Sequence, residues 1–255
     1  MRLPFFSRSR PTVDRARTAP IVPPGQRVYA IGDVHGCADE LRQLLDMIAI
    51  DHAERGPAAQ TVILLGDLVN RGPDSARAIG YARDLLASGV GRLLKGNHEE
   101  LFVLAARGDR QAARALMSNG GLATLMSFGL AEEEINRGSY ADLVTLLKRR
   151  LPRDVVTLLD AAEDKIAIGD YLFVHAGIRP GLPIAEQEGA DLRWIREEFL
   201  DSQVDHGAMI VHGHTVEKAI VECENRIGID TGAYKSGVLS AIGLEGAQRW
   251  FLSTG

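Results

Sequence analysis

Short apolar runs and amphipathic stretches alternate along the first part of the chain. Apolar runs at residues 28–31, 61–65 and 90–94 have the length of buried strands. The three stretches that follow them carry apolar side chains at the spacing of one helix face, at residues 39–50, 75–87 and 98–107. This alternation of strand and helix predicts an α/β fold with parallel strands.

The remainder of the chain departs from that rhythm. Residues 109–164 have a mainly helical pattern and predict a helical insertion, in which a Lys148-Arg149-Arg150 run is expected to be a solvated helix end, with contact to a long substrate as the alternative. After Lys165, strand-like runs return at closer spacing and predict a second, more antiparallel sheet. They lie at residues 166–168, 171–174, 209–211, 219–222, 226–229, 237–244 and 248–252. Because neither an internal repeat nor a long linker interrupts residues 27–255, we expect them to form a single domain.

Residues 1–26 have a different composition from the rest. They contain five arginines, five prolines and one acid, Asp14, and lack the apolar core of a secretory signal. A flexible, basic and proline-rich extension is the expectation, with a targeting peptide or an anion-binding tail as the alternative.

The whole-chain composition narrows the function classes. The net charge of -5 over 255 residues argues against a protein that coats nucleic acid or an anionic membrane. The chain has no apolar run of about 18 residues, the length that a membrane span needs. Two cysteines, Cys37 and Cys223, cannot build a disulfide framework, so the reducing cytoplasm is the expected location.

Five clusters of Asp, Asn and His follow the ends of predicted strands, and they contain five of the seven histidines. They are GDVHG at 32–36, GDLVNRG at 66–72, GNHE at 96–99, VHAG at 174–177 and HGHT at 212–215. Polar groups at the carboxyl ends of strands in an α/β sheet converge on one crevice. Imidazole mixed with carboxylate and amide suits Mn, Fe or Zn better than Mg or Ca. Six such ligands suffice for two ions that share a carboxylate, an arrangement suited to displacement at phosphorus.

These clusters resemble the signature of the phosphoprotein phosphatase family of calcineurin-like metallophosphoesterases, whose motifs are GDxHG, GDxxDRG, GNHE, HAG and GH. The resemblance runs from Arg27 to about Asp230 and is nearest to the bacterial and phage, lambda phosphatase-like branch, which shares the GHT ending. It implies a β-sandwich flanked by helices.

The resemblance also implies roles for individual residues. Asp33 and His35 would hold a first metal, Asp67 would bridge two metals, and Asn97, His175 and His214 would complete the second. Of His212 and His214, the GHT pattern favours His214. We expect two divalent ions, Mn²⁺ first, with Fe or Zn as alternatives.

The catalytic roles implied by the same resemblance concern groups around the phosphate. His98 would be the general acid for the leaving oxygen, and Arg71 would bind the phosphoryl oxygens. A second arginine is expected after HAG, with Arg196 as the candidate and Arg193 as its rival. The expected mechanism is direct attack by a metal-bridging hydroxide.

Asn70 departs from the family pattern, because the protein phosphatases usually carry an aspartate there. An amide can accept the imidazole N–H of His98 and fix its orientation, but it supplies no charge, which predicts a less basic His98 and a slower enzyme than an Asn70→Asp variant. Symmetric diadenosine tetraphosphate hydrolases also lack that acid and share the GDLVxRGP form of residues 66–73, but usually have GNHD where this chain has GNHE.

The expected function is therefore a metal-dependent phosphomonoester phosphatase, most of all a serine/threonine or dual-specificity protein phosphatase. The alternative is a symmetric diadenosine tetraphosphate hydrolase that releases two ADP, and a lesser alternative is a non-catalytic phosphate-binding scaffold. The expected partners are a phosphorylated protein or a small phosphate ester, without nucleic acid; the sequence leaves the oligomeric state open.

Overall fold

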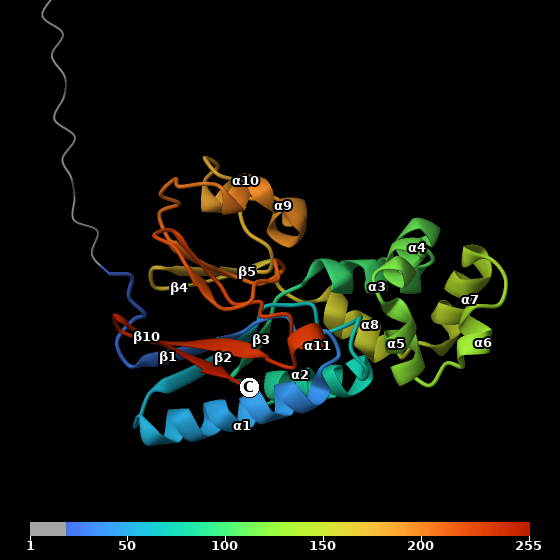
Figure 1. The fold of residues 1–255 in the computed structure, drawn as a ribbon, viewed down its shortest axis with the longest axis horizontal. Coiled ribbons are helices and arrows are strands. Elements are labelled where there is room, and N and C mark those ends of the chain that lie inside the picture. The colour runs from blue at the N-terminus through green and yellow to red at the C-terminus, as the bar shows by residue number, and fades with distance from the viewer. Residues whose placement is uncertain (1–18) are drawn as a thin grey trace, which may run out of the picture.

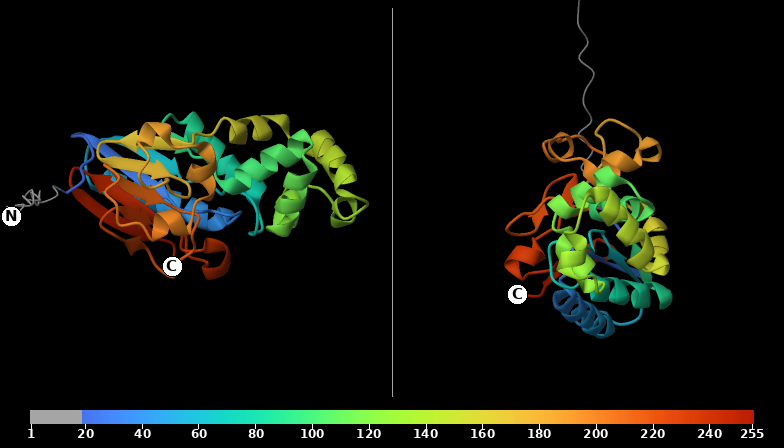
Figure 2. Two further views of the ribbon diagram at one scale, coloured as in Figure 1. Left: turned by 90° about the horizontal axis from the view of Figure 1, so that it is seen from above. Right: turned by 90° about the vertical axis from the view of Figure 1, so that its right-hand side faces the viewer.

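Two β-sheets stack face to face and helices cover both outer faces. The computed structural model describes residues 19–255 (Figure 1). Helices α1 (Ala38–Glu54) and α2 (Ser75–Ala87) lie under one sheet, and α9 (Gly189–Trp194) and α10 (Glu197–Leu200) lie over the other. The helices α3 to α8 project from one end of this sandwich (Figure 2).

The first sheet has the strand order β10-β9-β1-β2-β3. Its strands are β1 (Gln26–Ile31), β2 (Ala59–Leu64), β3 (Gly91–Leu93), β9 (Ser240–Glu245) and β10 (Gln248–Ser253). The pairs β1–β2 and β2–β3 are parallel, which confirms the parallel strands predicted for this part of the chain. Strand β9 pairs antiparallel with β1, with Ile31 opposite Ala241. The prediction that every strand after Lys165 joins the second sheet is therefore wrong for β9 and β10.

The second sheet has the order β4-β5-β6-β8-β7. Its strands are β4 (Lys165–Ile168), β5 (Tyr171–Val174), β6 (Met209–His212), β7 (Val221–Glu222) and β8 (Arg226–Gly228). The inner pairs β5–β6 and β6–β8 are parallel, whereas the edge strands β4 and β7 are antiparallel to their neighbours. The sheet is mixed, and its parallel centre places the ends of β5 and β6 together.

Alternation along the strands creates separate cores on the two faces of each sheet. In β1, Val28 and Ala30 face the second sheet, whereas Tyr29 and Ile31 belong to the core between the first sheet and helices α1 and α2. Successive side chains of a strand point to opposite faces, and here both faces are covered, which explains the continuous apolar run.

The predicted helical insertion is confirmed. Residues 109–164 contain α4 (Arg110–Ser118), α5 (Gly121–Ser127), α6 (Glu132–Ile135), α7 (Tyr140–Arg150) and α8 (Arg153–Asp160), and α3 (Asn97–Arg107) precedes them as the helix predicted after the third strand. Buried leucines on these helices, among them Leu116, Leu125 and Leu147, pack into the same core as α1 and α2. The remaining short elements are η1 (Ile184–Glu186) and α11 (Ala233–Ser236).

The last residues of the predicted N-terminal extension pack on the sandwich. Val22 is buried, and its N–H donates to the carbonyl of Gly246 (2.9 Å). The carbonyl of Ile21 accepts from the N–H of Asp170 (2.9 Å). The boundary expected at residue 26 is thus placed too late, and residues 1–18 lie outside the described part. None of the helices within residues 19–255 is long and apolar enough to cross a membrane.

Candidate metal centre and active site

The loops that carry the polar clusters meet at one end of the sandwich. Asp33 and His35 follow β1, Asp67 follows β2, and His175 follows β5. Asn97 begins α3, and His214 comes two residues after β6. All six side chains are buried. The structure therefore brings together the six residues that the sequence singled out as metal ligands.

A first ligand group consists of Asp33, His35 and Asp67. His35 Nε2 lies 3.5 Å from Asp67 Oδ2 and 4.0 Å from Asp33 Oδ2. His35 Nδ1 donates to the carbonyl of Val69 (2.8 Å), and because a carbonyl can only accept, Nε2 keeps its lone pair. Nε2 is buried and has no hydrogen-bond partner among the described residues, which suits an atom that binds a cation.

A second ligand group uses the other oxygen of Asp67. His175 Nε2 lies 3.5 Å from Asp67 Oδ1 and 3.0 Å from Asn97 Oδ1, while His175 Nδ1 donates to the carbonyl of Leu65 (2.9 Å). His214 Nδ1 lies 3.0 Å from the same Asn97 oxygen. Two sets of three donors lie close enough together to hold one cation each: His35, Asp67 and His98, and Asp67, His175 and His214. Asp67 belongs to both sets, and Asp33 and Asn97 adjoin them, so these donors fit two cations that share one carboxylate.

His212 lies outside both ligand groups. Its Nδ1 donates to the carbonyl of Gly213 (3.0 Å), and its ring packs edge-on against Phe199 at 5.1 Å between centroids. The geometry therefore favours His214 over His212 as a ligand.

Backbone strain is concentrated at this site. Within residues 19–255, the non-glycine residues with left-handed φ are His35, Asp67, Asn70, Arg71 and His214, with φ between 46° and 73°. Such conformations cost free energy and persist where the surrounding structure enforces them, typically at functional sites. Every one of them is a residue that the sequence analysis named.

Two glycines allow the carboxylates to approach the loops. A Cβ added to Gly213 would collide with Asp33 Oδ1, and one added to Gly96 would collide with Asp67 Oδ1. Because glycine has no side chain, both carboxylates reach the backbone: the N–H of His214 donates to Asp33 Oδ2 (3.0 Å) and the N–H of His98 donates to Asp67 Oδ1 (3.0 Å).

Burial controls the charges of the ligand groups. It raises the pKa of Asp67 to about 7 and that of Asp33 well above its usual value, and the neighbouring Asp230 raises the Asp33 pKa further. Burial also lowers the pKa of His175 to about 4 and that of His35 well below its usual value. The imidazoles are therefore neutral, as metal ligands must be, and the clustered carboxylates need compensating positive charge to ionise.

His98 lies between Asn70 and Arg71. The hydroxyl of Thr124 donates to Asn70 Oδ1 (3.1 Å), which turns Asn70 Nδ2 towards His98 Nδ1 (2.7 Å). On the other side of the ring, Arg71 Nη2 lies 3.3 Å from His98 Nε2. Asn70 is uncharged and Arg71 is positive, so neither supplies the negative charge that an aspartate would. The expectation that the amide accepts the imidazole N–H stays a prediction. Burial and then the Arg71 charge lower the pKa of His98 to about 3.

The two candidate arginines after HAG have different surroundings. Arg193 forms ion pairs with Glu100 (3.0 Å) and with Asp164. Arg196 is exposed and forms no ion pair within the described part of the chain. Its charge acts on the site, because it adds to burial and Arg71 in lowering the pKa of His98. The ion pairs of Arg193 therefore leave Arg196 as the better candidate for binding phosphate.

Three further residues belong to this region. Glu99 accepts from the N–H groups of Asp67 (2.6 Å) and Gly96 (3.0 Å) and so ties two of the loops together. Asp230 Oδ2 is buried without a hydrogen-bond partner among the described residues. The ring of Tyr234 lies 5.3 Å from that of His35. Asp230 follows the apolar run 226–229, so the strand-end signal that identified the other carboxylates could have found it.

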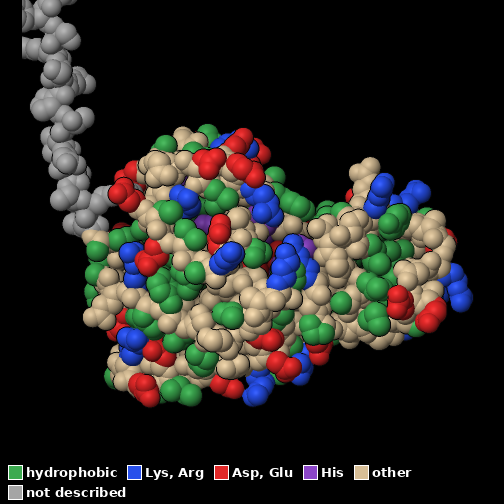
Figure 3. All heavy atoms as spheres, in the orientation of Figure 1, with side chains coloured by type: hydrophobic (Ala, Val, Ile, Leu, Met, Phe, Trp, Pro, Cys, Tyr) green, Lys and Arg blue, Asp and Glu red, His purple; other side chains and the backbone are tan. Residues whose placement is uncertain are grey.

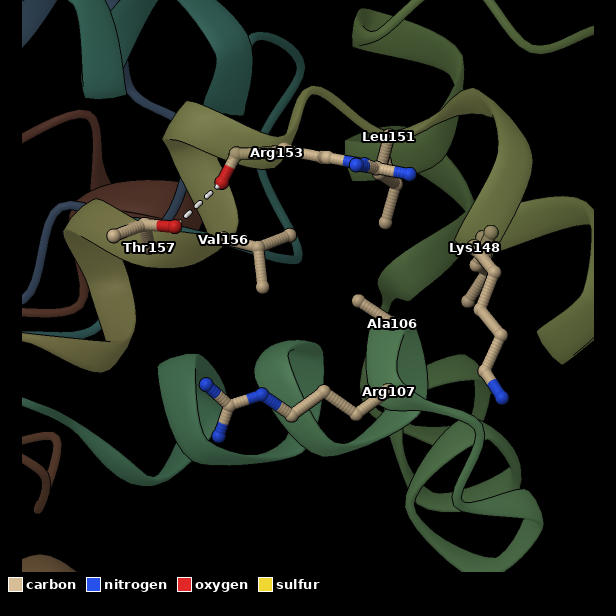
Figure 4. Close-up of a pocket in the computed structure, with 8 residues that line it drawn as sticks. Ala106, Arg107, Lys148, Leu151, Arg153, Val156 and Thr157 are labelled. Atoms are coloured by element: carbon tan, nitrogen blue, oxygen red, sulfur yellow. Dashed lines mark hydrogen bonds between the residues drawn. The ribbon is translucent and has the colours of Figure 1, made fainter.

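A separate hollow of about 270 Å³ lies between α3 and the helices α7 and α8 of the insertion, away from these residues. Arg107, Lys148 and Arg153 surround it from three helices (Figure 4). Lys148 Nζ lies against Gly108, just past the end of α3 that is opposite to His98. Since α3 has 11 residues, this is a separation of roughly 16 Å, which favours a solvated helix end for the Lys148–Arg150 run.

Histidine surface shows between Lys and Arg side chains near the centre of the face drawn in Figure 3. Positive groups at the rim of a pocket attract anions and raise their local concentration. The basic side chains around this histidine surface therefore suit a phosphate ester.

This site and fold define a calcineurin-like metallophosphoesterase. The sequence model of the calcineurin-like phosphoesterases matches residues 26–232, and the chain belongs to this family. The family consists of hydrolases with a dinuclear divalent metal centre, and the two groups of ligands described above are the candidates for that centre here. The predicted α/β sandwich flanked by helices is confirmed.

Relatives with assigned activities fall into two groups. A symmetrical bis(5'-nucleosyl)-tetraphosphatase of Nitrosospira multiformis is 26% identical over 215 residues, which cover 80% of this chain and 66% of that protein. One from Paracidovorax citrulli is 41% identical over 60% of this chain and 45% of its own length. Serine/threonine-protein phosphatase 1 of Salmonella typhimurium is 28% identical over 84% of this chain and 90% of its own length. The chain thus spans just under two thirds of the Nitrosospira relative.

A solved structure of a candidate diadenosine tetraphosphatase superposes with a TM-score of 0.61 over 93% of this chain and 100% of its own. At 22% identity, this likeness supports the fold alone. The expected place in the lambda phosphatase-like branch stays a prediction.

Proposed function

We propose that this metallophosphoesterase is a symmetrical dinucleoside tetraphosphate hydrolase that cleaves diadenosine tetraphosphate into two ADP. The observation that carries the proposal is the uncharged contact between Asn70 and His98 (2.7 Å). The order of preference expected from the sequence, with a protein phosphatase first, is thereby reversed.

The contact between Asn70 and His98 affects substrate preference, because different substrates need different amounts of acid catalysis at the leaving group. An aspartate at position 70 would stabilise protonated His98, whereas the Asn70 amide adds no negative charge. A serine alkoxide is a poor leaving group and needs a strong general acid, but ADP leaves as a stabilised phosphate anion. Neutral His98 is a weak acid and therefore limits the second reaction less than the first.

The side chains divide the work of hydrolysis. Asp33, His35, Asp67, Asn97, His175 and His214 would hold two divalent ions, with Mn²⁺ as our expectation. When bound, such ions supply an activated water and neutralise charge on the phosphoryl group. Arg71 and Arg196 would bind the phosphoryl oxygens, and His98 would supply the proton for the leaving oxygen.

The named relatives also favour a symmetrical tetraphosphatase. Two of the three relatives described above are symmetrical tetraphosphatases, one of them at 41% identity over the shared region. Serine/threonine phosphatase activity is the second candidate, because the Salmonella phosphatase is matched over 90% of its length.

A side-by-side assay tests the proposal. Purified protein with Mn²⁺ would be given diadenosine tetraphosphate, a phosphoserine peptide and a phosphotyrosine peptide, and kcat/KM would be compared. We expect the dinucleotide to be preferred at least about tenfold, a difference of about 1.4 kcal/mol in transition-state stabilisation. An Asp67→Asn variant controls for contaminating hydrolases and should lose all three activities. Preference for a phosphopeptide would instead support the second candidate.

A further inference from the structure

The short helix α11 lies beside the candidate metal centre and carries the neighbouring residues Tyr234 and Lys235. The ring of Tyr234 packs edge-on against His35, with 5.3 Å between centroids, and the Arg71 guanidinium lies over the same ring at 4.7 Å. Tyr234 therefore contacts both a candidate metal ligand and the candidate phosphate-binding arginine. A cation over an aromatic ring is held there by electrostatic attraction.

Lys235 adds a second cation to this ring. Its Nζ lies 5.2 Å from the Tyr234 ring centroid, and its side chain is exposed. Within residues 19–255, neither Lys235 nor Arg71 forms an ion pair with a carboxylate. The two cations lie at most 9.9 Å apart, because they lie 4.7 Å and 5.2 Å from the centroid of the same ring. Their like charges repel each other, and a bound polyanion would relieve that repulsion.

The segment that carries Lys235 is fixed to the site. Gly232 and Gly237 bound α11, both in the left-handed conformation, with φ of 64° and 71°. The N–H of Gly232 donates to Asp230 Oδ1 (2.9 Å), at the end of β8. The position of Lys235 relative to the ligand groups is therefore set by the sandwich itself.

A phosphomonoester and a dinucleoside tetraphosphate place different demands on this region. With one phosphoryl group at the candidate metal centre and against Arg71, a monoester has no further phosphate to bind. A tetraphosphate chain continues past Arg71 with phosphates that carry additional negative charge. An ammonium just beyond Arg71 is suited to those phosphates and not to a monoester.

We propose that Tyr234 and Lys235 form a subsite for the outer phosphates of a polyphosphate chain, with the Lys235 ammonium binding them and the Tyr234 ring positioning Lys235 and Arg71. This inference rests on the proposed function, since it names the part of the site that selects a polyphosphate over a monoester. Lys235 is a specificity residue, and Tyr234 is a positioning residue.

The direct test compares Lys235→Gln with wild type on two substrates. The KM for diadenosine tetraphosphate should rise about tenfold, the size expected for one lost charge-assisted contact, whereas the KM for p-nitrophenyl phosphate should change less than twofold. Lys235→Arg should retain most of the affinity for the dinucleotide. Arg42→Gln, an equal change of net charge on the exposed face of α1, should leave both KM values unchanged. An unchanged KM of Lys235→Gln for the dinucleotide would overturn the inference.

A second measurement separates this inference from the proposed function. Inorganic tripolyphosphate and orthophosphate would be compared as inhibitors of p-nitrophenyl phosphate hydrolysis at a fixed free Mn²⁺ concentration. In Lys235→Gln the Ki of tripolyphosphate should rise about tenfold and that of orthophosphate should not change. If wild type fails to cleave diadenosine tetraphosphate, the proposed function fails, and this assay still decides on the subsite. An equal effect on both inhibitors, or on neither, would contradict a polyphosphate subsite.

Two substitutions of Tyr234 test its positioning role separately. Tyr234→Phe keeps the ring and should behave as wild type, whereas Tyr234→Leu should raise the KM for both substrates because Arg71 loses its support. A Tyr234→Leu variant with both KM values unchanged would remove Tyr234 from the subsite.

Discussion

Asp67 is the residue shared by the two ligand groups. Its Oδ2 lies 3.5 Å from His35 Nε2 and its Oδ1 lies 3.5 Å from His175 Nε2. Loss of this carboxylate therefore affects both metal positions, whereas loss of Asn97 affects one.

Metal content tests that arrangement. Wild type purified with Mn²⁺ should bind two ions per chain by equilibrium dialysis, Asp67→Asn should lose tight binding of both, and Asn97→Ala should keep one. Chelation should lower the Tm of wild type, since ions that bind only the folded state stabilise it. Wild-type stoichiometry in Asp67→Asn would show that the carboxylate is not a shared ligand.

Asn70 contacts the ring of His98 without supplying a charge, 2.7 Å from Nδ1. In Asn70→Asp the carboxylate would accept from His98 Nδ1 and raise the pKa of His98 from its low value of about 3. Turnover of a phosphoserine peptide should rise by roughly tenfold or more, within the range that a general acid contributes, and by less for diadenosine tetraphosphate. The measurement is kcat for both substrates from pH 5 to 9. Equal or lower peptide turnover across this range would refute the role given to Asn70.

At this scale the sequence was informative where a side chain follows a strand end. That local signal identified the five polar clusters, and the family resemblance assigned the six candidate ligands, His98 and Arg71 within them, which the structure brings together. Thr124 and Tyr234 carry no such signal, because they reach the site through contacts between segments far apart in the chain. Thr124, for example, lies 54 residues from the Asn70 that it orients.

Among the elements, α5 connects the helical insertion to the site. The hydroxyl of Thr124 accepts from the N–H of Asn70 (2.7 Å) and donates to Asn70 Oδ1, and the carbonyl of Gly120 accepts from the N–H of Arg71 (3.1 Å). The insertion therefore holds the strained Asn70–Arg71 turn.

Thr124→Val tests that connection. It should cost about 1–3 kcal/mol of stability, because it leaves buried polar groups of Asn70 unpaired, and it should lower kcat more than it changes KM. Thr145→Val is the matched control, because the Thr145 hydroxyl bonds only within its own helix, to the carbonyl of Ala141, and is exposed. Its stability and kcat should match wild type. The same result for Thr124→Val would mean that α5 does not support the site.

The helices and strands were largely predictable from the sequence, but the pairing of the later strands was not. The helices and the parallel strands β1, β2 and β3 follow from local periodicity. Strand β9 has an apolar pattern that suits the centre of either sheet, and its pairing with β1 joins residues more than 200 positions apart. Local patterns contain no information on which of two sheets such a strand completes.

At the scale of the whole molecule, the buried Arg27 side chain links segments of the chain that are far apart in the sequence. Arg27 is fully buried, and its Nε donates to Glu245 Oε2 (2.8 Å) while its Nη1 donates to the carbonyl of Gly56 (3.1 Å). The hydrogen bond from Arg27 holds the pKa of Glu245 below its usual value. The Glu245 carboxylate therefore stabilises the fold above its unfolded pKa of about 4.3, and this stabilisation is lost as the pH falls through the lower folded value.

Glu245→Gln should lower the free energy of unfolding by about 1 kcal/mol at pH 6, because Glu245 is partly exposed. The difference from wild type should shrink towards zero as the pH is lowered from 5 to 3. Urea unfolding of both proteins across this range measures it. A difference that is constant with pH would show that the ion pair does not contribute as a charge interaction.

The architecture explains why chemistry gathers at one end of the sandwich. Parallel strands from both sheets end there, and the insertion closes one side with α5. Relatives named as symmetrical tetraphosphatases and as a serine/threonine-protein phosphatase match the same chain, so we expect the residues around the candidate metal centre, and not the fold, to select the substrate.

The central claim is symmetric cleavage at a dinuclear metal centre, and the products of diadenosine tetraphosphate hydrolysis test it most directly. Wild type with Mn²⁺ would be incubated with the dinucleotide, and the nucleotides would be separated by anion-exchange chromatography at early times. We predict ADP as the only nucleotide product, two molecules for each substrate consumed, with no product after chelation. AMP together with ATP, or an intact dinucleotide under conditions in which a phosphopeptide is hydrolysed, would contradict the account.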